Sequence, residues 1–134
     1  MIGIFLITHG TLGESLIQCV CHVLGKRPPQ LVQLGVTPQD DPADVLTMVR
    51  QMLSWVDSGQ GVVILTDIYG ATPSNIAAKL MKPDYVECVS GVNLPMLLRM
   101  LTYRDKDMPS LLRSAVSGGC DGVMHAKDTG DRDC

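Results

Sequence analysis

The segment Ile2-Gly-Ile-Phe-Leu-Ile-Thr-His-Gly-Thr11 decides how this chain folds. Residues 2–8 form a continuous apolar run that is typical of a strand covered on both faces. From residue 12 to residue 24 the apolar side chains recur at helical spacing instead. Thr11 and Glu14 fit a capping box at the start of this helix. The segment therefore predicts a buried strand that turns directly into a helix, with His9 at the junction.

The same alternation of strand and helix patterns continues along the rest of the chain. Asp41 and Pro42 open the second helix, because aspartate is a good N-cap and proline is tolerated at the first helical position. The glycine pair at 118–119 is expected to end the last helix before a short final strand. The predicted strands cover residues 2–8, 30–36, 62–66, 85–89 and 122–126, and the predicted helices cover residues 12–24, 42–56, 72–81, 95–103 and 109–117.

Strands that alternate with helices predict an α/β fold, here a three-layer α/β/α sandwich with a mostly parallel central sheet. The short C-terminal strand, 122–126, is expected at an edge of that sheet. One domain is expected to fill residues 1–127, because no linker, repeat or low-complexity segment interrupts the pattern. Residues 128–134 are polar and are expected to form a frayed tail.

Composition and charge narrow the classes of function. Of the 134 residues, 46% are hydrophobic and 19% are charged, which is typical of an ordered globular protein. A net charge of −3, with one Trp, three Tyr and one Phe, argues against nucleic-acid binding. No apolar run is long enough to span a membrane, and no basic segment precedes the first strand, so we expect neither membrane insertion nor a signal peptide.

The five cysteines include no C-x-x-C pair, which favours reduced thiols in a cytoplasmic protein. His125 has no ligand partner at metal-site spacing, so no metal is expected, and no cofactor is expected either.

Polar residues follow the predicted strands at the edge where ligands of parallel sheets bind. His9 and Asp67 stand in equivalent places, each directly after its strand, and Ser90 ends another. If the first and third strands are neighbours, the two side chains come within hydrogen-bonding distance. A carboxylate on one ring nitrogen would fix the tautomer and leave the other nitrogen as a nucleophile for a phosphoryl group.

Four further residue positions are candidate phosphate ligands around this pair. Backbone N–H groups at Gly10 and Thr11, and at Gly70 and Ala71, stand near the starts of helices, where anions are favoured. The hydroxyl of residue 72, a threonine, adds a possible side-chain ligand. The same residues also fit purely structural roles, since glycines form tight turns and aspartate and threonine cap helices.

Three stretches of the sequence resemble the IIA component of the mannose family of the bacterial phosphoenolpyruvate-dependent phosphotransferase system. Ile4-Phe-Leu-Ile-Thr-His-Gly10 resembles the family's first strand and its phosphorylated histidine. Thr66-Asp-Ile-Tyr-Gly-Ala-Thr-Pro-Ser-Asn75 resembles its Asp-x-aromatic-Gly-Gly-Ser-Pro-x-Asn loop, and Val89-Ser-Gly-Val-Asn-Leu-Pro-Met-Leu98 is similar to its Gly-Val-Asn-hydrophobic-Pro-Met segment. The three motifs occur in the family's order and span nearly the whole domain.

The resemblance assigns roles to the candidate residues. It implies that His9 accepts the phosphoryl group on the ring nitrogen farther from the backbone, that Asp67 orients the ring, and that Thr72 stands where the family usually has serine. Ala71 and Tyr69 depart from the family's second glycine and its tryptophan, which affects contact with a partner more than the chemistry.

The resemblance also implies partners. HPr would donate the phosphoryl group and a separate IIB component would accept it for sugar uptake, because we expect no fused IIB domain. It further implies a homodimer in which the C-terminal strand is exchanged. Two alternatives stay open. One is a regulatory phosphoprotein whose phosphorylation state controls a protein partner. The other is a small-molecule hydrolase that uses the His–Asp pair, for which no serine or cysteine nucleophile stands at a strand-to-helix elbow and only Thr11 is available.

Overall fold

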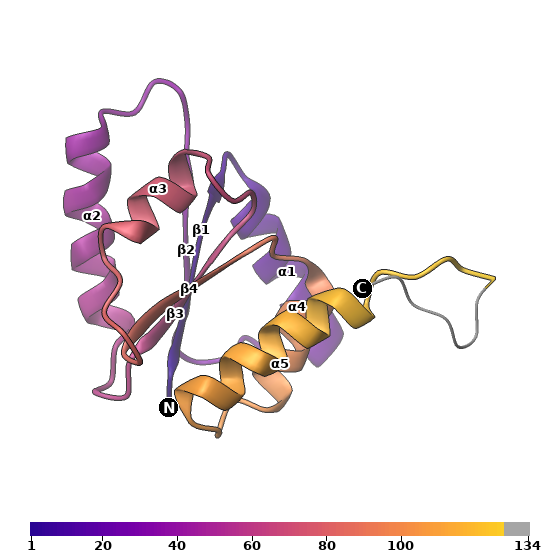
Figure 1. Cartoon of the computed structure of the whole chain (residues 1–134). Helices are drawn as coiled ribbons and strands as arrows, with labels where there is room; N and C mark the ends of the chain where they lie inside the picture. The colour runs from indigo at the N-terminus through magenta and orange to yellow at the C-terminus, as the bar shows by residue number, and fades with distance from the viewer. Residues whose placement is uncertain (128–134) are drawn as a thin grey trace.

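The structure is a computed structural model that describes residues 1–127. Five helices pack on a four-stranded sheet within these residues, in two layers that enclose the sheet (Figure 1). The strands are β1 (Gly3–His9), β2 (Leu31–Val36), β3 (Val62–Thr66) and β4 (Val86–Ser90); the helices are α1 (Leu12–Leu24), α2 (Pro42–Val56), α3 (Thr72–Ala78), α4 (Leu94–Thr102) and α5 (Met108–Asp121).

The described sheet has the strand order β2-β1-β3-β4, and every pair of neighbours is parallel. The chain steps from β1 to β2 on one side, and β3 and β4 then extend the sheet on the other side. In the register of β1 and β3, Ile7 lies beside Thr66. The carboxyl ends of β1 and β3 are therefore neighbours at the point where the strand order reverses, which is where such sheets bind ligands.

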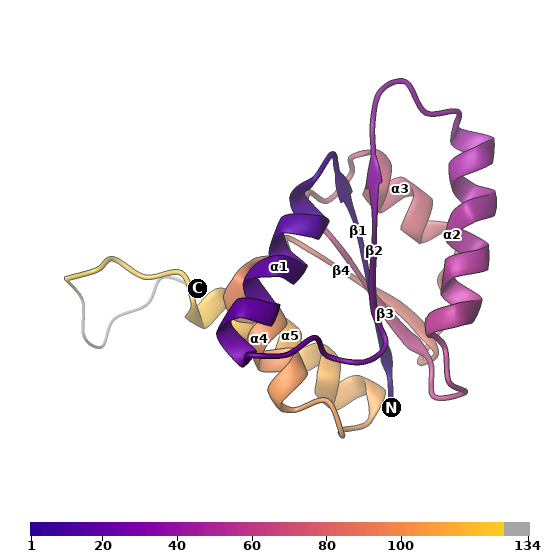
Figure 2. The ribbon, with the colours of Figure 1, turned by 180° about the vertical axis from the view of Figure 1, so that it is seen from behind.

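Alternate side chains of the central strands fill two separate cores. Helices α1, α4 and α5 cover one face of the sheet, and α2 and α3 cover the other (Figure 2). Ile4 and Leu6 of β1 belong to the core on the first face, whereas Phe5 and Ile7 belong to the core on the second. All four side chains are fully buried, and each contributes roughly 1.5–3 kcal/mol of transfer free energy. Two-sided burial explains why β1 appears in the sequence as a continuous apolar run.

Most of the predicted elements are confirmed to within one residue at each end. The predicted strand 62–66 and the helix 12–24 match β3 and α1, and the Asp41 side chain caps α2 by accepting a hydrogen bond from the N–H of Ala43 at 2.9 Å. Helix α3 is shorter than predicted, because it ends at Ala78 in tight i→i+3 hydrogen bonds. No helix within residues 1–127 is long and apolar enough to cross a lipid bilayer.

The prediction for the C-terminal region is wrong. Gly118 and Gly119 lie inside α5, which continues to Asp121, and residues 122–126 contain no strand. A Cβ at Gly119 would lie 2.9 Å from Met96 Cε, and one at Gly122 would lie 2.3 Å from Pro95 Cβ. These glycines are thus present because α4 packs closely against α5, and that long-range reason is invisible to a local reading of the sequence.

Residues 122–127, which follow α5, run away from the rest of the molecule (Figures 1 and 2). The predicted polar tail, 128–134, lies outside the described residues, so the division into a domain of residues 1–127 and a tail stays a prediction.

Candidate functional site

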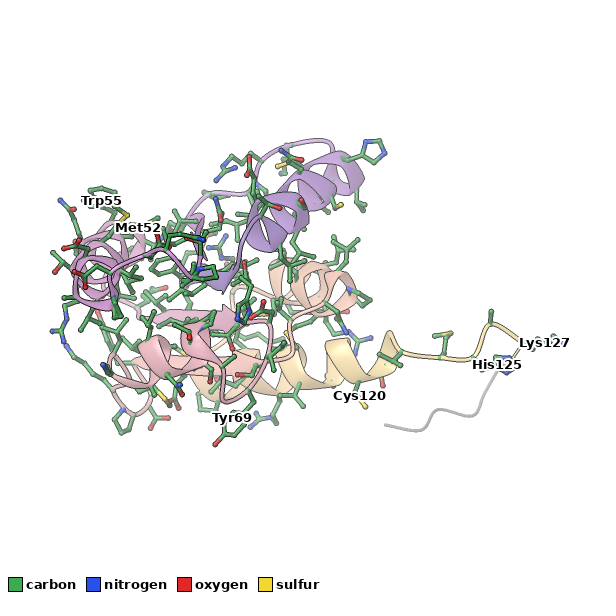
Figure 3. All side chains as sticks on the ribbon, turned by 90° about the horizontal axis from the view of Figure 1, so that it is seen from above. Met52, Trp55, Tyr69, Cys120, His125 and Lys127 are labelled. Atoms are coloured by element: carbon green, nitrogen blue, oxygen red, sulfur yellow. The ribbon has the colours of Figure 1, made fainter. Side chains whose placement is uncertain are left out.

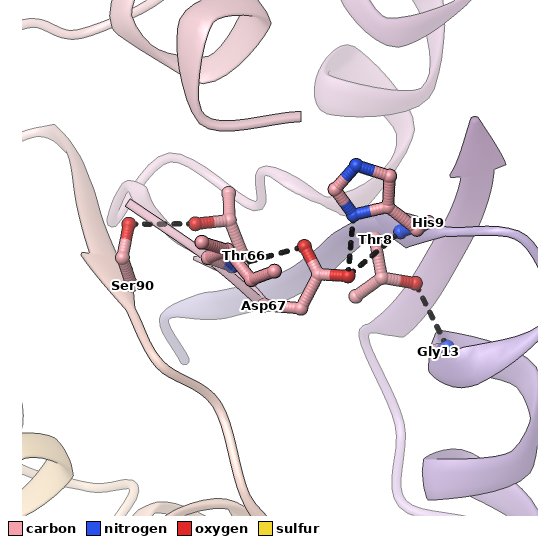
Figure 4. Close-up of polar contacts among 7 residues, drawn as sticks. Thr8, His9, Gly13, Thr66, Asp67 and Ser90 are labelled. Atoms are coloured by element: carbon pink, nitrogen blue, oxygen red, sulfur yellow. Dashed lines mark hydrogen bonds and ion pairs between the residues drawn. The ribbon is translucent and has the colours of Figure 1, made fainter. Parts of the chain in front are cut away.

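His9 and Asp67 meet at the carboxyl edge of the sheet, as the sequence predicts if β1 and β3 are neighbours. The Oδ2 atom of Asp67 accepts a hydrogen bond from the backbone N–H of His9 at 2.9 Å, and it lies 2.8 Å from the Nδ1 atom of the His9 ring. Oδ1 accepts the backbone N–H of Ile68 at 3.0 Å. One carboxylate therefore holds both the backbone and the ring of the histidine (Figure 4).

The charge on Asp67 determines which ring nitrogen carries the proton. Burial by itself raises the pKa of this carboxyl, but hydrogen bonds from the backbone and ring of His9 and from its own backbone outweigh burial, so the pKa is lowered below its usual 3.8. At neutral pH the group is a carboxylate, which only accepts hydrogen bonds. Nδ1 must then be the donor, and in the neutral ring the lone pair is on Nε2.

The lone pair faces outward. Nε2 points away from Asp67 in Figure 4, and the His9 side chain is 49% exposed while that of Asp67 is only 9% exposed. The carboxylate is thus shielded from water while the opposite nitrogen of the ring is accessible from solution. This arrangement suits a nucleophile that reacts with a group presented by another molecule.

Two turns beside the pair require glycine. Gly10 and Gly70 have φ angles of 54° and 84°, in the left-handed region, and a Cβ at either position would meet no atom within 4 Å. Backbone conformation alone therefore selects glycine there. Ala71 has an extended conformation with φ of −87°, so the alanine that replaces the family's second glycine is accommodated without strain.

The backbone donors predicted for phosphate are only partly available. The N–H of Gly10 donates to Val36 O at 2.9 Å, and that of Ala71 donates to Ile68 O at 3.4 Å. Thr11 is the N-cap residue of α1. Thr72 is the exposed first residue of α3, directly after the loop that carries Asp67. Of the four backbone positions predicted as phosphate ligands, Gly10 therefore already donates a hydrogen bond of ordinary length, and Ala71 donates a long one.

The predicted capping box is wrong, although Thr11 does precede the helix. The side chain of Thr11 makes no cap hydrogen bond. Instead the hydroxyl oxygen of Thr8, a fully buried residue of β1, accepts the N–H of Gly13 at 2.8 Å. A cap that comes from the preceding strand depends on how α1 folds back on β1, so the local sequence pattern does not reveal it.

Three residues that the sequence analysis did not single out help to shape the site. Thr8 and Thr66 are the last fully buried residues before His9 and Asp67. Gly35 of β2 lets the backbone turn after His9 lie against the strand, since a Cβ there would be 1.9 Å from Gly10 O. An isolated glycine within an apolar strand is a usable signal of such close approach.

Apolar side chains lie beside the pair on the loop after β3. Ile68 is 59% exposed and Tyr69 is 86% exposed, and Figure 3 shows Tyr69 extending away from the body of the molecule. Within the described residues, no group of three or more His, Cys, Asp or Glu side chains is placed to hold a metal ion.

Comparisons with known proteins agree with this architecture. A family model described as PTS system fructose IIA component, EIIA-man, matches residues 3–115. The chain is 30% identical over 129 residues to the PTS system mannose-specific EIIAB component of Escherichia coli strain K12, covering 94% of this chain and 40% of that protein. It is also 26% identical over 125 residues to the PTS system sorbose-specific EIIA component of Klebsiella pneumoniae, covering 90% of each.

A solved structure shares the fold. The phosphotransferase system component EIIA from Streptococcus agalactiae superposes with a TM-score of 0.84 at 20% sequence identity, over 95% of this chain and 98% of that one. The chain spans about 40% of the length of the mannose-specific relative that it matches. Because the family model covers most of the chain, including both strands that carry His9 and Asp67, this protein belongs to the EIIA-man family, described as the PTS system fructose IIA component.

Proposed function

We propose that this protein is a phosphocarrier that receives a phosphoryl group on Nε2 of His9 and passes it to another protein. The observation that carries the proposal is the 2.8 Å contact between Nδ1 of His9 and Oδ2 of Asp67, with the ring half exposed on its other side. The shielded Asp67 carboxylate holds the ring at Nδ1, and the accessible Nε2 on the opposite side of the ring is a nucleophile that can be used repeatedly.

The transfer step requires little from the protein beyond positioning and electrostatics. The Nε2 lone pair attacks the phosphorus of a phosphohistidine on the donor protein; the new N–P bond forms as the donor's N–P bond breaks, and the donor nitrogen keeps that bond's electron pair. Positive charge then develops on the His9 ring, and the Asp67 carboxylate at Nδ1 stabilises it. Transfer to the acceptor is the same step in reverse with a different partner.

Four neighbouring residues are the proposed ligands of the phosphoryl oxygens. In the turn after β1 these are Gly10 and Thr11, and in the loop after β3 they are Gly70 and Ala71. The hydroxyl of residue 72, a threonine, is the proposed side-chain ligand. The N–H of Gly10 already donates a hydrogen bond to Val36 O. In that turn the N–H of the next residue, Thr11, is therefore the stronger candidate to bind a phosphoryl oxygen.

We propose HPr as the donor and a IIB component as the acceptor, so that any sugar is met only downstream, in cytoplasmic phosphotransfer that leads to uptake. The exposed Ile68 and Tyr69 suit a transient protein interface, because apolar and aromatic side chains there exclude water without requiring a large buried area.

We also propose that the protein is a homodimer. Val123 and Met124 are exposed apolar residues on the segment that leaves the body after α5, and β4 is an outer strand of the described sheet. If that segment pairs with β4 of a second copy, the two apolar side chains and the outer edge of β4 are both covered. Light scattering at micromolar concentration should report a dimer, and a Val123→Asp, Met124→Asp double variant should report a monomer; a monomeric parent protein would contradict the proposal.

Phosphorylation in a defined mixture tests the phosphocarrier role. Incubation with phosphoenolpyruvate, Enzyme I and HPr should place an acid-labile phosphate on the protein, and His9→Ala should abolish it. His22→Ala is the matched control, because His22 is an exposed histidine in the last turn of α1. Labelling that persists in His9→Ala, or that is lost in His22→Ala alone, would refute the assignment of His9.

A further inference from the structure

Two threonines occupy matching places behind the His9–Asp67 pair. Thr8 immediately precedes His9 at the end of β1, and Thr66 immediately precedes Asp67 at the end of β3. Both are fully buried. A buried hydroxyl is costly unless it is hydrogen bonded, and an apolar residue would otherwise be favoured in a strand covered on both faces. The presence of a hydroxyl at each of these buried positions therefore requires a hydrogen-bonding role.

The hydroxyl of Thr8 ties the strand that carries His9 to the helix that follows it. Its oxygen accepts the backbone N–H of Gly13 at 2.8 Å, in the first turn of α1 (Figure 4). Thr11, the N-cap residue, makes no side-chain cap bond. The orientation of the α1 N-terminus relative to His9 is thus set by Thr8, the residue of β1 that directly precedes the histidine in the sequence.

The hydroxyl of Thr66 ties the strand that carries Asp67 to the outer strand β4. Its Oγ1 lies 2.7 Å from Oγ of Ser90 (Figure 4). Its carbonyl oxygen accepts the N–H groups of Gly91 and Val92 at 2.9 and 3.0 Å. Burial raises the pKa of the neighbouring Cys88 thiol and outweighs the lowering effect of the Thr66 and Ser90 hydroxyls, so the thiol remains protonated. The carboxyl end of β3 is therefore held on its outer side directly before Asp67.

The two hydroxyls act from opposite faces of the sheet. Thr8 has the same parity along β1 as Ile4 and Leu6, which face α1, α4 and α5, whereas Thr66 has the parity of Ile64, which faces α2 and α3. The two hydroxyls bond to Gly13 and Ser90 and not to the His9 ring. Their influence on the chemistry must therefore pass through the backbone of the residue that follows each of them.

We propose that Thr8 and Thr66 are positioning residues for phosphoryl transfer: Thr8 sets the α1 N-terminus against His9, and Thr66 sets Asp67 against the His9 ring. The proposal rests on the phosphocarrier function for its rate readout. A substitution far from the reacting atoms that misplaces them by about 1 Å can slow a reaction about 100-fold. The two buried hydrogen bonds at the strand ends are therefore expected to affect the transfer rate through the positions of His9 and Asp67.

Isosteric substitutions separate the hydroxyl from the shape of the side chain. Thr66→Val and Thr8→Val remove the hydroxyl at nearly constant volume, whereas Thr66→Ser and Thr8→Ser keep it. Thr102→Val is the matched control, because the Thr102 hydroxyl donates to Leu98 O on α4, far along the chain from the site. Transfer from phosphorylated HPr is measured in single turnover, and unfolding by urea is measured for every variant.

The ring of His9 supplies a second readout that needs no phosphotransfer. Nitrogen-15 chemical shifts of the two ring nitrogens report which one carries the proton, and a carboxylate at Asp67, 2.8 Å from Nδ1, requires the proton to be on Nδ1. Thr66→Val should shift these signals toward a mixture of tautomers and slow transfer about 10- to 100-fold, with both effects reversed in Thr66→Ser. Thr8→Val should slow transfer by about tenfold and leave the ring signals unchanged, with the rate restored in Thr8→Ser.

The outcomes that overturn the proposal differ from those that overturn the function. Wild-type transfer rates in both valine variants, or equal losses in the valine and serine variants, would remove the hydroxyls from the mechanism. Unshifted ring signals in Thr66→Val would do the same for Thr66 even if the wild-type protein accepts no phosphate. If Thr66→Val does not fold, Ser90→Ala removes the same hydrogen bond from its half-buried partner and must reproduce the predicted shift.

Discussion

Replacing Asp67 by asparagine tests the carboxylate with almost no change of shape. Oδ2 faces two N–H donors of His9, at 2.9 and 2.8 Å, and Oδ1 faces the N–H of Ile68 at 3.0 Å. All three neighbours are donors, whereas an asparagine amide presents one oxygen and one NH₂ group. Either orientation of the amide therefore points NH₂ at a donor and leaves at least one N–H without an acceptor.

The expected magnitude follows from this geometry. Hydrogen bonds to a charged group contribute about 1.5–3 kcal/mol and neutral ones about 0.5–1.5 kcal/mol, so the free energy of unfolding should fall by about 1–3 kcal/mol. Solvent screening reduces this little, because the Asp67 side chain is only 9% exposed. Weaker stabilisation of the positive ring in the transition state should slow transfer about 10- to 100-fold, equivalent to about 1.4–2.8 kcal/mol in the barrier.

Rapid-quench transfer from labelled phospho-HPr measures the rate, and circular dichroism with urea titration measures the fold and its stability. Asp44→Asn is the matched control, because Asp44 is an exposed carboxylate in the first turn of α2. It should leave the transfer rate unchanged and lower the stability by no more than the about 0.3–1 kcal/mol of its interaction with the helix dipole. A folded Asp67→Asn protein that transfers phosphate within twofold of the wild-type rate would refute the reasoning.

Three further predictions concern the surroundings of the site and the pH dependence. Gly35→Ala should slow transfer by about tenfold, because the new Cβ would lie 1.9 Å from Gly10 O and displace the turn after the histidine. Gly122→Ala should destabilise the protein to urea by about 1–3 kcal/mol, since its Cβ would lie 2.3 Å from Pro95 Cβ while its backbone is helical and unstrained. Because the folded-state pKa of Asp67 is lowered, the stability lost in its asparagine variant should be constant above pH 3.8 and should shrink as the pH falls through the folded-state pKa.

Each of these three predictions would be contradicted by a specific result. Unchanged transfer in Gly35→Ala would mean that the turn moves without consequence for the histidine. Val116→Ala, at an exposed position of α5, the helix that ends at the C-cap residue Gly122, should change stability by no more than about 0.5 kcal/mol. A loss there equal to that in Gly122→Ala would argue against steric packing of α4 and α5. A stability difference that persists to the most acidic pH would show that Asp67 contributes through shape and not through its charge.

Local patterns in the sequence were sufficient for most of the elements and for the two central site residues. Continuous apolar runs predicted β1 and β3, because a strand buried on both faces has no polar side to alternate with. His9 and Asp67 were found because each is the first polar residue with acid–base chemistry after such a run. The Asp41 cap was found for a similar reason, since an N-cap and its helix are neighbours in sequence.

Only the tertiary structure decided which elements are neighbours. The order β2-β1-β3-β4 brings His9 and Asp67 together, and nothing within either strand encodes that adjacency. The glycines of α5 were misinterpreted as a helix end because their meaning lies in the surface of α4, and the cap of α1 was assigned to Thr11 because Thr8 reaches Gly13 only after the helix folds back. Side-chain periodicity records which face of an element is buried, whereas pairing and close packing depend on residues far away in the chain.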